Sequence, residues 1–377
     1  MANGPKKYSF RNDYSEGAHP EVLEALLRTN RDQQDGYGND DYCEDAKKAI
    51  YDLIGSDTAH ILFASGDIRA NFMSISGQLW PGEALIATRP ELIDSKEIEP
   101  TKAVGHMILV HSDGYGRLTP AIIQSAFDEN TQFHCQPRPK LVLITNTTEL
   151  GMVYRKEQLE PVAAICKKLG LLLIMDGTRL GVALASKRND MTLQDIFRLT
   201  DVFWIGGGHN GALLGEAVVF KDPSLGNRFS YQMEQRGLLP AKSRVLGIQF
   251  KALFKDRLFF RLATDAVEKA AKIAMYFNSM PTPLYVYRDE ANHVFVDFQH
   301  KRLVDHLREY FDFVVLGGSG SCVRLVTSWA TEHSEIDRLI RAVDDWMGEN
   351  YFDPNSDSDE GMHELCDSDV DEGEDED

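Results

Sequence analysis

The side chains best suited to chemistry in this chain lie in turns that directly follow short apolar runs. They are His209 after residues 202–205, Asp176 and Arg179 after residues 171–175, and Asp67 and Arg69 after residues 59–64. Histidine titrates near neutrality, with an unperturbed pKa of about 6.5, so it is a natural general acid or base. A neighbouring carboxylate orients the ring and stabilises its charged form. The residue types therefore predict a site for proton transfer.

Two arginines extend this site towards acidic ligands. Arg179 and Arg324 each follow or lie within an apolar segment. A guanidinium fork grips a carboxylate through two parallel hydrogen bonds. With a titrating histidine nearby, the pair favours proton transfer, elimination, dehydration, retro-aldol cleavage or cyclisation on an oxygenated acid.

The apolar runs themselves indicate the fold class. Residues 140–145 and 171–175 are nearly continuous apolar strands, as expected for a sheet that is buried on both faces. Residues 156–166 between them predict a crossover helix, and 202–206 predict a further strand that ends in glycines. Such units imply a mostly parallel α/β sheet. Ligands bind beyond the carboxyl ends of its strands, so the turns after Ala64, Thr145, Met175 and Ile205 are candidate site loops.

The 377 residues divide into four predicted parts. These are an N-terminal arm (1–48), a large α/β domain (49–255), a small C-terminal α+β domain (256–348) and a disordered acidic tail (349–377). Residues 353–377 contain 13 Asp and Glu and no Lys or Arg. Removing them changes the net charge from −19 to −6, which is ordinary for a folded body.

Composition excludes several classes of protein. We expect no nucleic-acid partner, because the chain has no basic patch of consequence. We expect no membrane partner, because no apolar run approaches the roughly 20 residues that a membrane span needs. The N-terminus lacks the apolar core of a secretory signal, so a cytoplasmic location is the default. No cysteine pair has CxxC spacing, and we expect no metal site.

Six segments, in order, resemble motifs of the threonine aldolase / aromatic amino acid β-eliminating lyase family. They are residues 10–20, 35–40, 144–151, 175–181, 204–217 and 324–331. The resemblance implies the pyridoxal phosphate (PLP) fold type I, a small-molecule substrate, and a homodimer or homotetramer. It implies that Asp176 pairs with the pyridine nitrogen. It also implies that Arg179, Arg324 and Ser15 lie near the cofactor or the substrate carboxylate.

Three positions depart from the family pattern, and all three concern the cofactor. His209 stands where the family has the lysine that forms the Schiff base with PLP, and an imidazole has no primary amine. In the phosphate loop, Asp67 introduces a negative charge and Ile68 removes a hydroxyl, whereas a phosphate needs open N–H groups and hydroxyl donors. Arg69 attracts anions, but in the alignment it lies one residue after the position of the phosphate contact. Leu92 falls at the position of the family's ring-stacking histidine.

The concerted changes lead to the expectation that the chain has lost PLP-dependent catalysis and uses no cofactor. We expect a repurposed acid/base enzyme of lyase, dehydratase or cyclase type. The residues assigned to it are His209, Asp176 and Asp67 as catalytic groups, and Arg179, Arg324, Ser15 and Arg69 as substrate-binding groups, with Glu97 as a further candidate. Two alternatives stay open. One is a non-catalytic pseudoenzyme that acts through dimerisation or partner binding, and the other is a threonine aldolase or β-eliminating lyase that binds PLP non-covalently.

Overall fold

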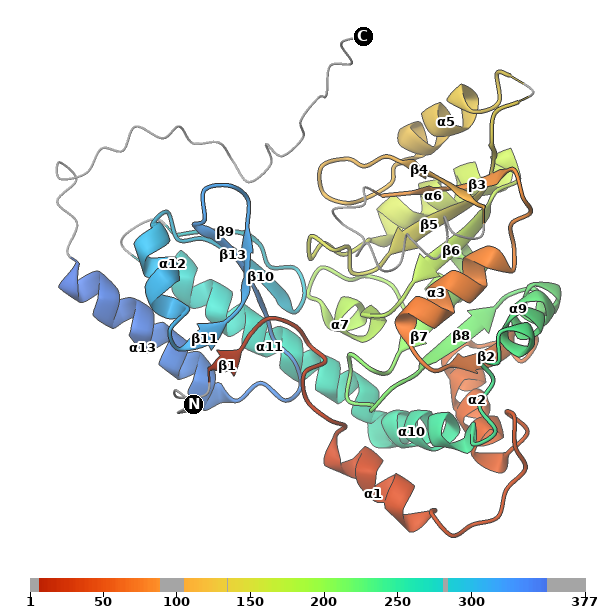
Figure 1. Cartoon of the computed structure of the whole chain (residues 1–377), viewed down its shortest axis with the longest axis horizontal. Helices are drawn as coiled ribbons and strands as arrows, with labels where there is room; N and C mark the ends of the chain where they lie inside the picture. The colour runs from red at the N-terminus through yellow and green to blue at the C-terminus, as the bar shows by residue number, and fades with distance from the viewer. Residues whose placement is uncertain (1–6, 89–104, 134, 281–283, 351–377) are drawn as a thin grey trace.

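The computed structural model describes residues 7–88, 105–133, 135–280 and 284–350, and a seven-stranded sheet forms its larger half (Figure 1). The strand order is β2-β8-β7-β6-β5-β3-β4. Its strands are β2 (His60–Ala64), β3 (Glu83–Ala87), β4 (Met107–Val110), β5 (Arg138–Thr145), β6 (Leu172–Asp176), β7 (Val202–Gly206) and β8 (Glu216–Phe220). The neighbours from β4 to β7 pair in parallel, whereas β8 is antiparallel to both β7 and β2. The predicted mostly parallel α/β sheet is thus confirmed.

Helices cover both faces of this sheet, which is why its central strands are apolar throughout. They are α1 (Pro20–Arg28), α2 (Asp41–Ile54), α3 (Asp67–Ser76), α5 (Pro120–Glu129), α6 (Lys156–Leu169), α7 (Leu180–Ala185), α8 (Leu193–Leu199), α9 (Pro223–Gln235) and α10 (Arg244–Phe254). One buried cluster joins one face to α2, α6, α8 and α10, and a second joins the other face to α3 and α9. The predicted crossover helix at 156–166 is α6, which links the parallel strands β5 and β6.

A smaller antiparallel sheet, in the order β12-β13-β10-β9, forms the second half (Figure 1). Its elements and those around it are β9 (Tyr285–Arg288), β10 (His293–Asp297), α12 (Lys301–Leu307), β11 (Phe311–Asp312), β12 (Val314–Leu316), β13 (Cys322–Val326) and α13 (His333–Glu349). The N-terminal strand β1 (Tyr8–Ser9) pairs in parallel with β11. The chain therefore starts against the small half and then crosses to the large one.

The connection between the halves is broken where the sequence predicts a continuous helical stretch from 246 to 278. Helix α10 ends at Phe254, a single 3-10 turn covers Lys255–Arg257, and α11 (Leu258–Asn278) then begins. Asp256 and Arg257 have φ values of 49° and 58°, which residues other than glycine rarely adopt. No proline or glycine lies at the break, so the residue types there do not predict it.

The ends of β6 and β7 approach each other so closely that only glycine fits. A Cβ on Gly177 would lie 1.7 Å from the Trp204 carbonyl oxygen, and one on Gly206 would lie 1.9 Å from that of Thr178. The turn that carries Asp176 and Arg179 is consequently fixed against the strand that leads to His209.

Three predictions fall outside the described residues, namely those for Leu92, Glu97 and the acidic tail beyond residue 350. The bounds of the four predicted parts stay predictions. Among the described residues, no helix is both long and apolar enough to cross a membrane.

Candidate functional site

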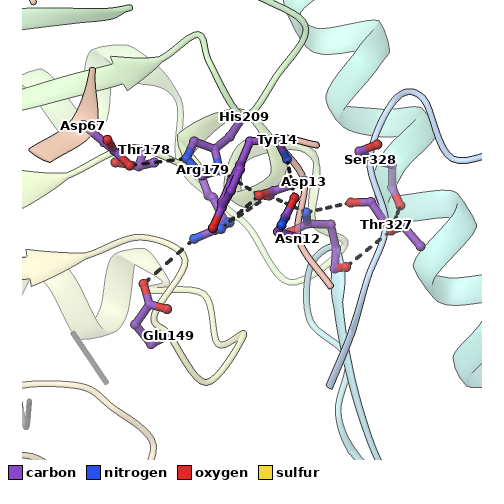
Figure 2. A network of polar contacts seen from close by, with 12 residues as sticks. Asn12, Asp13, Tyr14, Asp67, Glu149, Thr178, Arg179, His209, Thr327 and Ser328 are labelled. Carbon is purple, nitrogen blue, oxygen red and sulfur yellow. Dashed lines mark hydrogen bonds and ion pairs between the residues drawn. The ribbon is translucent and has the colours of Figure 1, made fainter. Parts of the chain in front are cut away.

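A buried carboxylate, Asp13, lies at the centre of the polar network at the carboxyl ends of the strands (Figure 2). Its two oxygens accept hydrogen bonds from Nε and Nη2 of Arg179 at 2.8 and 2.9 Å. Asn292 Nδ2 donates to it at 3.0 Å from the small half. Burial alone would raise the pKa of Asp13, but Arg179 and His209 hold it well below its ordinary value. The network thus joins the N-terminal segment to both halves of the chain.

His209 is held between two carboxylates. Its Nδ1 lies 2.7 Å from Asp13 Oδ1, and its Nε2 lies 3.4 Å from Asp67 Oδ2 (Figure 2). The Tyr14 ring meets the imidazole edge to face, with the centroids 5.0 Å apart. Burial lowers the pKa of His209, but Asp13 outweighs that effect and the net shift is upward. His209 therefore contacts two carboxylates, Asp13 and Asp67, where the sequence led us to expect one.

Two further carboxyl groups, Asp176 and Glu216, lie close by without a cation. Asp176 ends β6, is 5% exposed, and accepts a hydrogen bond from the Thr178 N–H at 2.9 Å. Burial raises its pKa to about 6. Glu216 begins β8, is 1% exposed, and has one oxygen with no hydrogen-bond partner. Burial, with Asp67 and Asp176 nearby, raises its pKa well above the ordinary value. Within the described part of the chain Asp176 forms no ion pair, although the charge of Arg179 reaches it.

The lone carboxylate of Asp176 leads to a stability prediction. The folded state raises its pKa from 3.8 to about 6, so the folded protein loses stability as the pH rises between these values. We expect Asp176→Asn to raise the free energy of unfolding by about 2–3 kcal/mol at pH 8, and to change little at pH 4. Urea unfolding of both proteins at the two pH values measures the difference. Equal stability at pH 8 would contradict an uncompensated charge.

Arg324, on β13, forms no ion pair within the described residues. Its Nε is buried and has no hydrogen-bond partner, and no ion pair to it occurs among the described residues. Burial and the nearby Arg179 both lower its pKa. Arg179, by contrast, already forms an ion pair with Asp13. A second carboxylate, Glu149, lies with its Oε1 3.9 Å from Arg179 Nη1. Arg324 is therefore the better placed of the two predicted arginines to receive a carboxylate.

The structure brings together some predicted site residues and separates others. His209, Asp67 and Arg179 share one network, and Asp176 lies beside it. Ser15 is exposed and donates to Asn12 Oδ1 at 2.8 Å, while Arg69 is exposed and donates to Ser65 Oγ at 2.6 Å. Neither side chain hydrogen-bonds directly to His209, Asp13 or Asp67 in the described part of the chain, and their substrate-binding roles stay predictions.

Sequence reasoning missed Asp13. It lies 196 residues from His209 and 166 from Arg179, so no local spacing connects them. The available signal was the position of Asp13 within the matched segment 10–20.

Comparison with known proteins identifies relatives across most of the chain. A family model described as beta-eliminating lyase matches residues 9–326. The structure of threonine aldolase from Leishmania major superposes with a TM-score of 0.85 at 37% identity, over 90% of this chain and 99% of that one. A low specificity L-threonine aldolase from Pseudomonas sp. (strain NCIMB 10558) is 29% identical, over 89% of this chain and 97% of its own. Cystalysin from Treponema denticola, whose structure contains PLP, shares the fold at 16% identity and a TM-score of 0.68, over 89% and 90%.

These findings confirm the resemblance and the predicted fold, and they correct the expectation about the cofactor. The prediction that the chain uses no cofactor is wrong: the matched beta-eliminating lyase family and the threonine aldolase relatives point to PLP binding. The alignment of His209 with the family's lysine, the homo-oligomer and the cytoplasmic location stay predictions.

Proposed function

Because the chain belongs to the beta-eliminating lyase family, we propose that it binds PLP non-covalently and cleaves a small β-hydroxy-α-amino acid. L-Threonine is the first candidate, since it is the substrate named for the curated relatives. The reaction would break the bond between Cα and Cβ and yield glycine and an aldehyde. This reaction belongs to the retro-aldol class that the residue types favour.

The observation that carries the proposal is Asp176, a buried carboxylate that forms no ion pair among the described residues. A protonated pyridine nitrogen would supply the missing positive charge and would relieve the cost of keeping this group ionised. When bound, the cofactor supplies an electron sink for the pair released at Cα. His209 has no primary amine and cannot form a covalent link to it. We therefore expect reversible binding.

Arg324 supports the substrate assignment. Its buried, unpartnered Nε would receive the α-carboxylate of an amino acid, which satisfies a donor that otherwise stays unpaired. Asp13 and Arg179 hold His209 behind the reacting atoms, and the Tyr14 ring covers one edge of the imidazole. The chain's own residues thus orient the substrate and provide charged groups for proton transfer.

The direct test is equilibrium dialysis against PLP, followed by an assay with L-threonine. PLP retained above the free concentration, with stoichiometry near one, is expected, together with acetaldehyde and glycine in equal amounts. Asp176→Asn is the matched control, because it removes the ring partner without changing the shape of the site. Equal PLP retention by the variant and the wild type would contradict the proposed fit.

Removal of Arg324 should act on substrate binding. We expect Arg324→Gln to raise KM for L-threonine by about 100-fold, since a buried charge-assisted carboxylate contact contributes about 2–3 kcal/mol. PLP retention should change little. Steady-state kinetics at saturating PLP measures the effect, and Arg198→Gln serves as a control at an arginine whose side chain is 59% exposed and pairs with Glu160. An unchanged KM would remove Arg324 from the substrate site.

A further inference from the structure

The contacts of His209 fix its charge. Each ring nitrogen faces a carboxylate oxygen, Asp13 Oδ1 at 2.7 Å and Asp67 Oδ2 at 3.4 Å. An ionised carboxylate only accepts hydrogen bonds, so both nitrogens must carry a proton for both contacts to be favourable. A neutral imidazole would instead turn a lone pair towards one of the two oxygens. The geometry describes an imidazolium, and an imidazolium cannot serve as a base.

The two carboxylates beside it differ in what else they bind. The Asp13 side chain is 1% exposed, and Arg179 and Asn292 use its oxygens. The Asp67 side chain is 35% exposed, and its Oδ1 accepts from the Ile68 N–H at 2.8 Å. The His209 side chain, 9% exposed, lies between them. Of Asp13, His209 and Asp67, only Asp67 is therefore exposed enough to contact a ligand.

We propose that Asp67, and not His209, is the proton acceptor of the site, and that His209 is a fixed cation that positions Asp67 and keeps it ionised. The inference rests on the proposed function. Asp67 takes the proton of the β-hydroxyl, the oxygen forms the aldehyde carbonyl, and the bond between Cα and Cβ breaks. The same proton then returns to Cα, which gives glycine and leaves Asp67 ionised again.

Asp67 needs this cation because its surroundings are otherwise acidic. Burial raises the pKa of Asp67, and the hydrogen bond and charge of His209 reverse that shift, with help from the Ile68 N–H and Arg179. The carboxyls of Asp176 and Glu216 interact with it from the ends of β6 and β8. Without the imidazolium, burial and these acidic neighbours would raise the pKa of Asp67 and disfavour its ionised form. His209 therefore acts through Asp67 rather than on the substrate.

The first test reads the charge of His209 without any assay of activity. In the full-length protein with ¹⁵N-labelled histidine, the His209 ring signals are assigned by their loss in His209→Gln. We expect both ring nitrogens to be protonated at pH 7.5. In Asp67→Asn, the titration midpoint of His209 should fall by at least about one pH unit, a tenfold change in proton affinity. A neutral ring at pH 7.5 in the wild type would overturn the proposal.

The second test uses the pH dependence of kcat/KM for L-threonine at saturating PLP. The acidic limb should move to higher pH by at least about one unit in His209→Gln, because the pKa of Asp67 rises, and activity should recover at alkaline pH. Asp67→Asn should lower kcat by about 10²–10⁴-fold at every pH, whereas Asp67→Glu, which keeps a carboxylate, should retain more. Activity that is lost at every pH in His209→Gln, or kept in Asp67→Asn, would overturn the assignment. A wild-type protein that cleaves nothing contradicts the proposed function, while the ring signals still decide the charge of His209.

Discussion

Replacing His209 by lysine is expected to convert reversible PLP binding into covalent capture. The wild type has no primary amine at this position, so borohydride treatment should leave residue 209 unmodified. In His209→Lys, the amine can condense with the cofactor aldehyde, and reduction should fix it there in a large fraction of the molecules. Peptide mass spectrometry measures the fraction modified at residue 209.

The pH dependence of this capture has a defined sign. Asp13 and Asp67 would face the new ammonium group, and opposite charges at this distance favour the charged form and raise its pKa. Condensation needs the neutral amine, so capture should rise from pH 7 to pH 9. His209→Gln is the matched control, because it fills the position without an amine. Modification of Lys187 and Lys221, the nearest lysines along the chain, reports the nonspecific background.

The result would also test the alignment on which the cofactor position depends. If His209→Lys binds PLP at equilibrium but no adduct forms at residue 209, the aldehyde does not lie at this side chain. The assignment of position 209 to the family's lysine would then be wrong, although the fold and Asp176 would be unaffected.

The sequence was sufficient for the elements that position the site. Nearly continuous apolar runs located β5, β6 and β7, because strands buried on both faces have no polar side to obscure them. The turns after Ala64, Met175 and Ile205 do carry Asp67, Asp176 and the His209 loop. Carboxyl ends of strands that run in the same direction meet at one edge, so the convergence followed from topology.

The contacts between the site residues could not be predicted from the sequence. Asp13 reaches His209 because β1 pairs with β11 and holds the N-terminal segment near the small half. That placement depends on long-range pairing and leaves no local pattern. The break at Asp256 and Arg257 was missed for a related reason, since packing holds these residues at positive φ where their types do not favour it. The charge of His209 could not be predicted either, because the carboxylates of Asp13 and Asp67 that raise its pKa come from distant parts of the chain.

The largest loss of stability in the chain's polar network is expected on removing the charge of Asp13. Its side chain is 1% exposed, and Arg179 and His209 both depend on it for compensation. Breaking a buried ion pair by removing one partner leaves an uncompensated buried charge, so Asp13→Asn should lower the free energy of unfolding by about 3–5 kcal/mol at pH 7. Urea unfolding measures this. The exposed pair of Arg11 and Asp312, 3.8 Å apart, offers the control, and Asp312→Asn should cost about 1 kcal/mol or less.

The dependence on pH separates lost charge from lost packing. The folded state holds the pKa of Asp13 well below its ordinary value of 3.8. Its stabilisation is therefore complete above that ordinary value and is lost as the pH falls through the folded pKa. The gap between the wild type and Asp13→Asn should narrow below about pH 4, and it should also narrow as the pH rises above 6.5 through the folded pKa of His209, which Asp13 raises. In a double-mutant cycle, His209→Gln should cost less in the Asp13→Asn background than in the wild type, by at least about 1 kcal/mol. Additive effects would mean that Asp13 stabilises the fold through Arg179 alone and does not hold the imidazolium on which Asp67 depends.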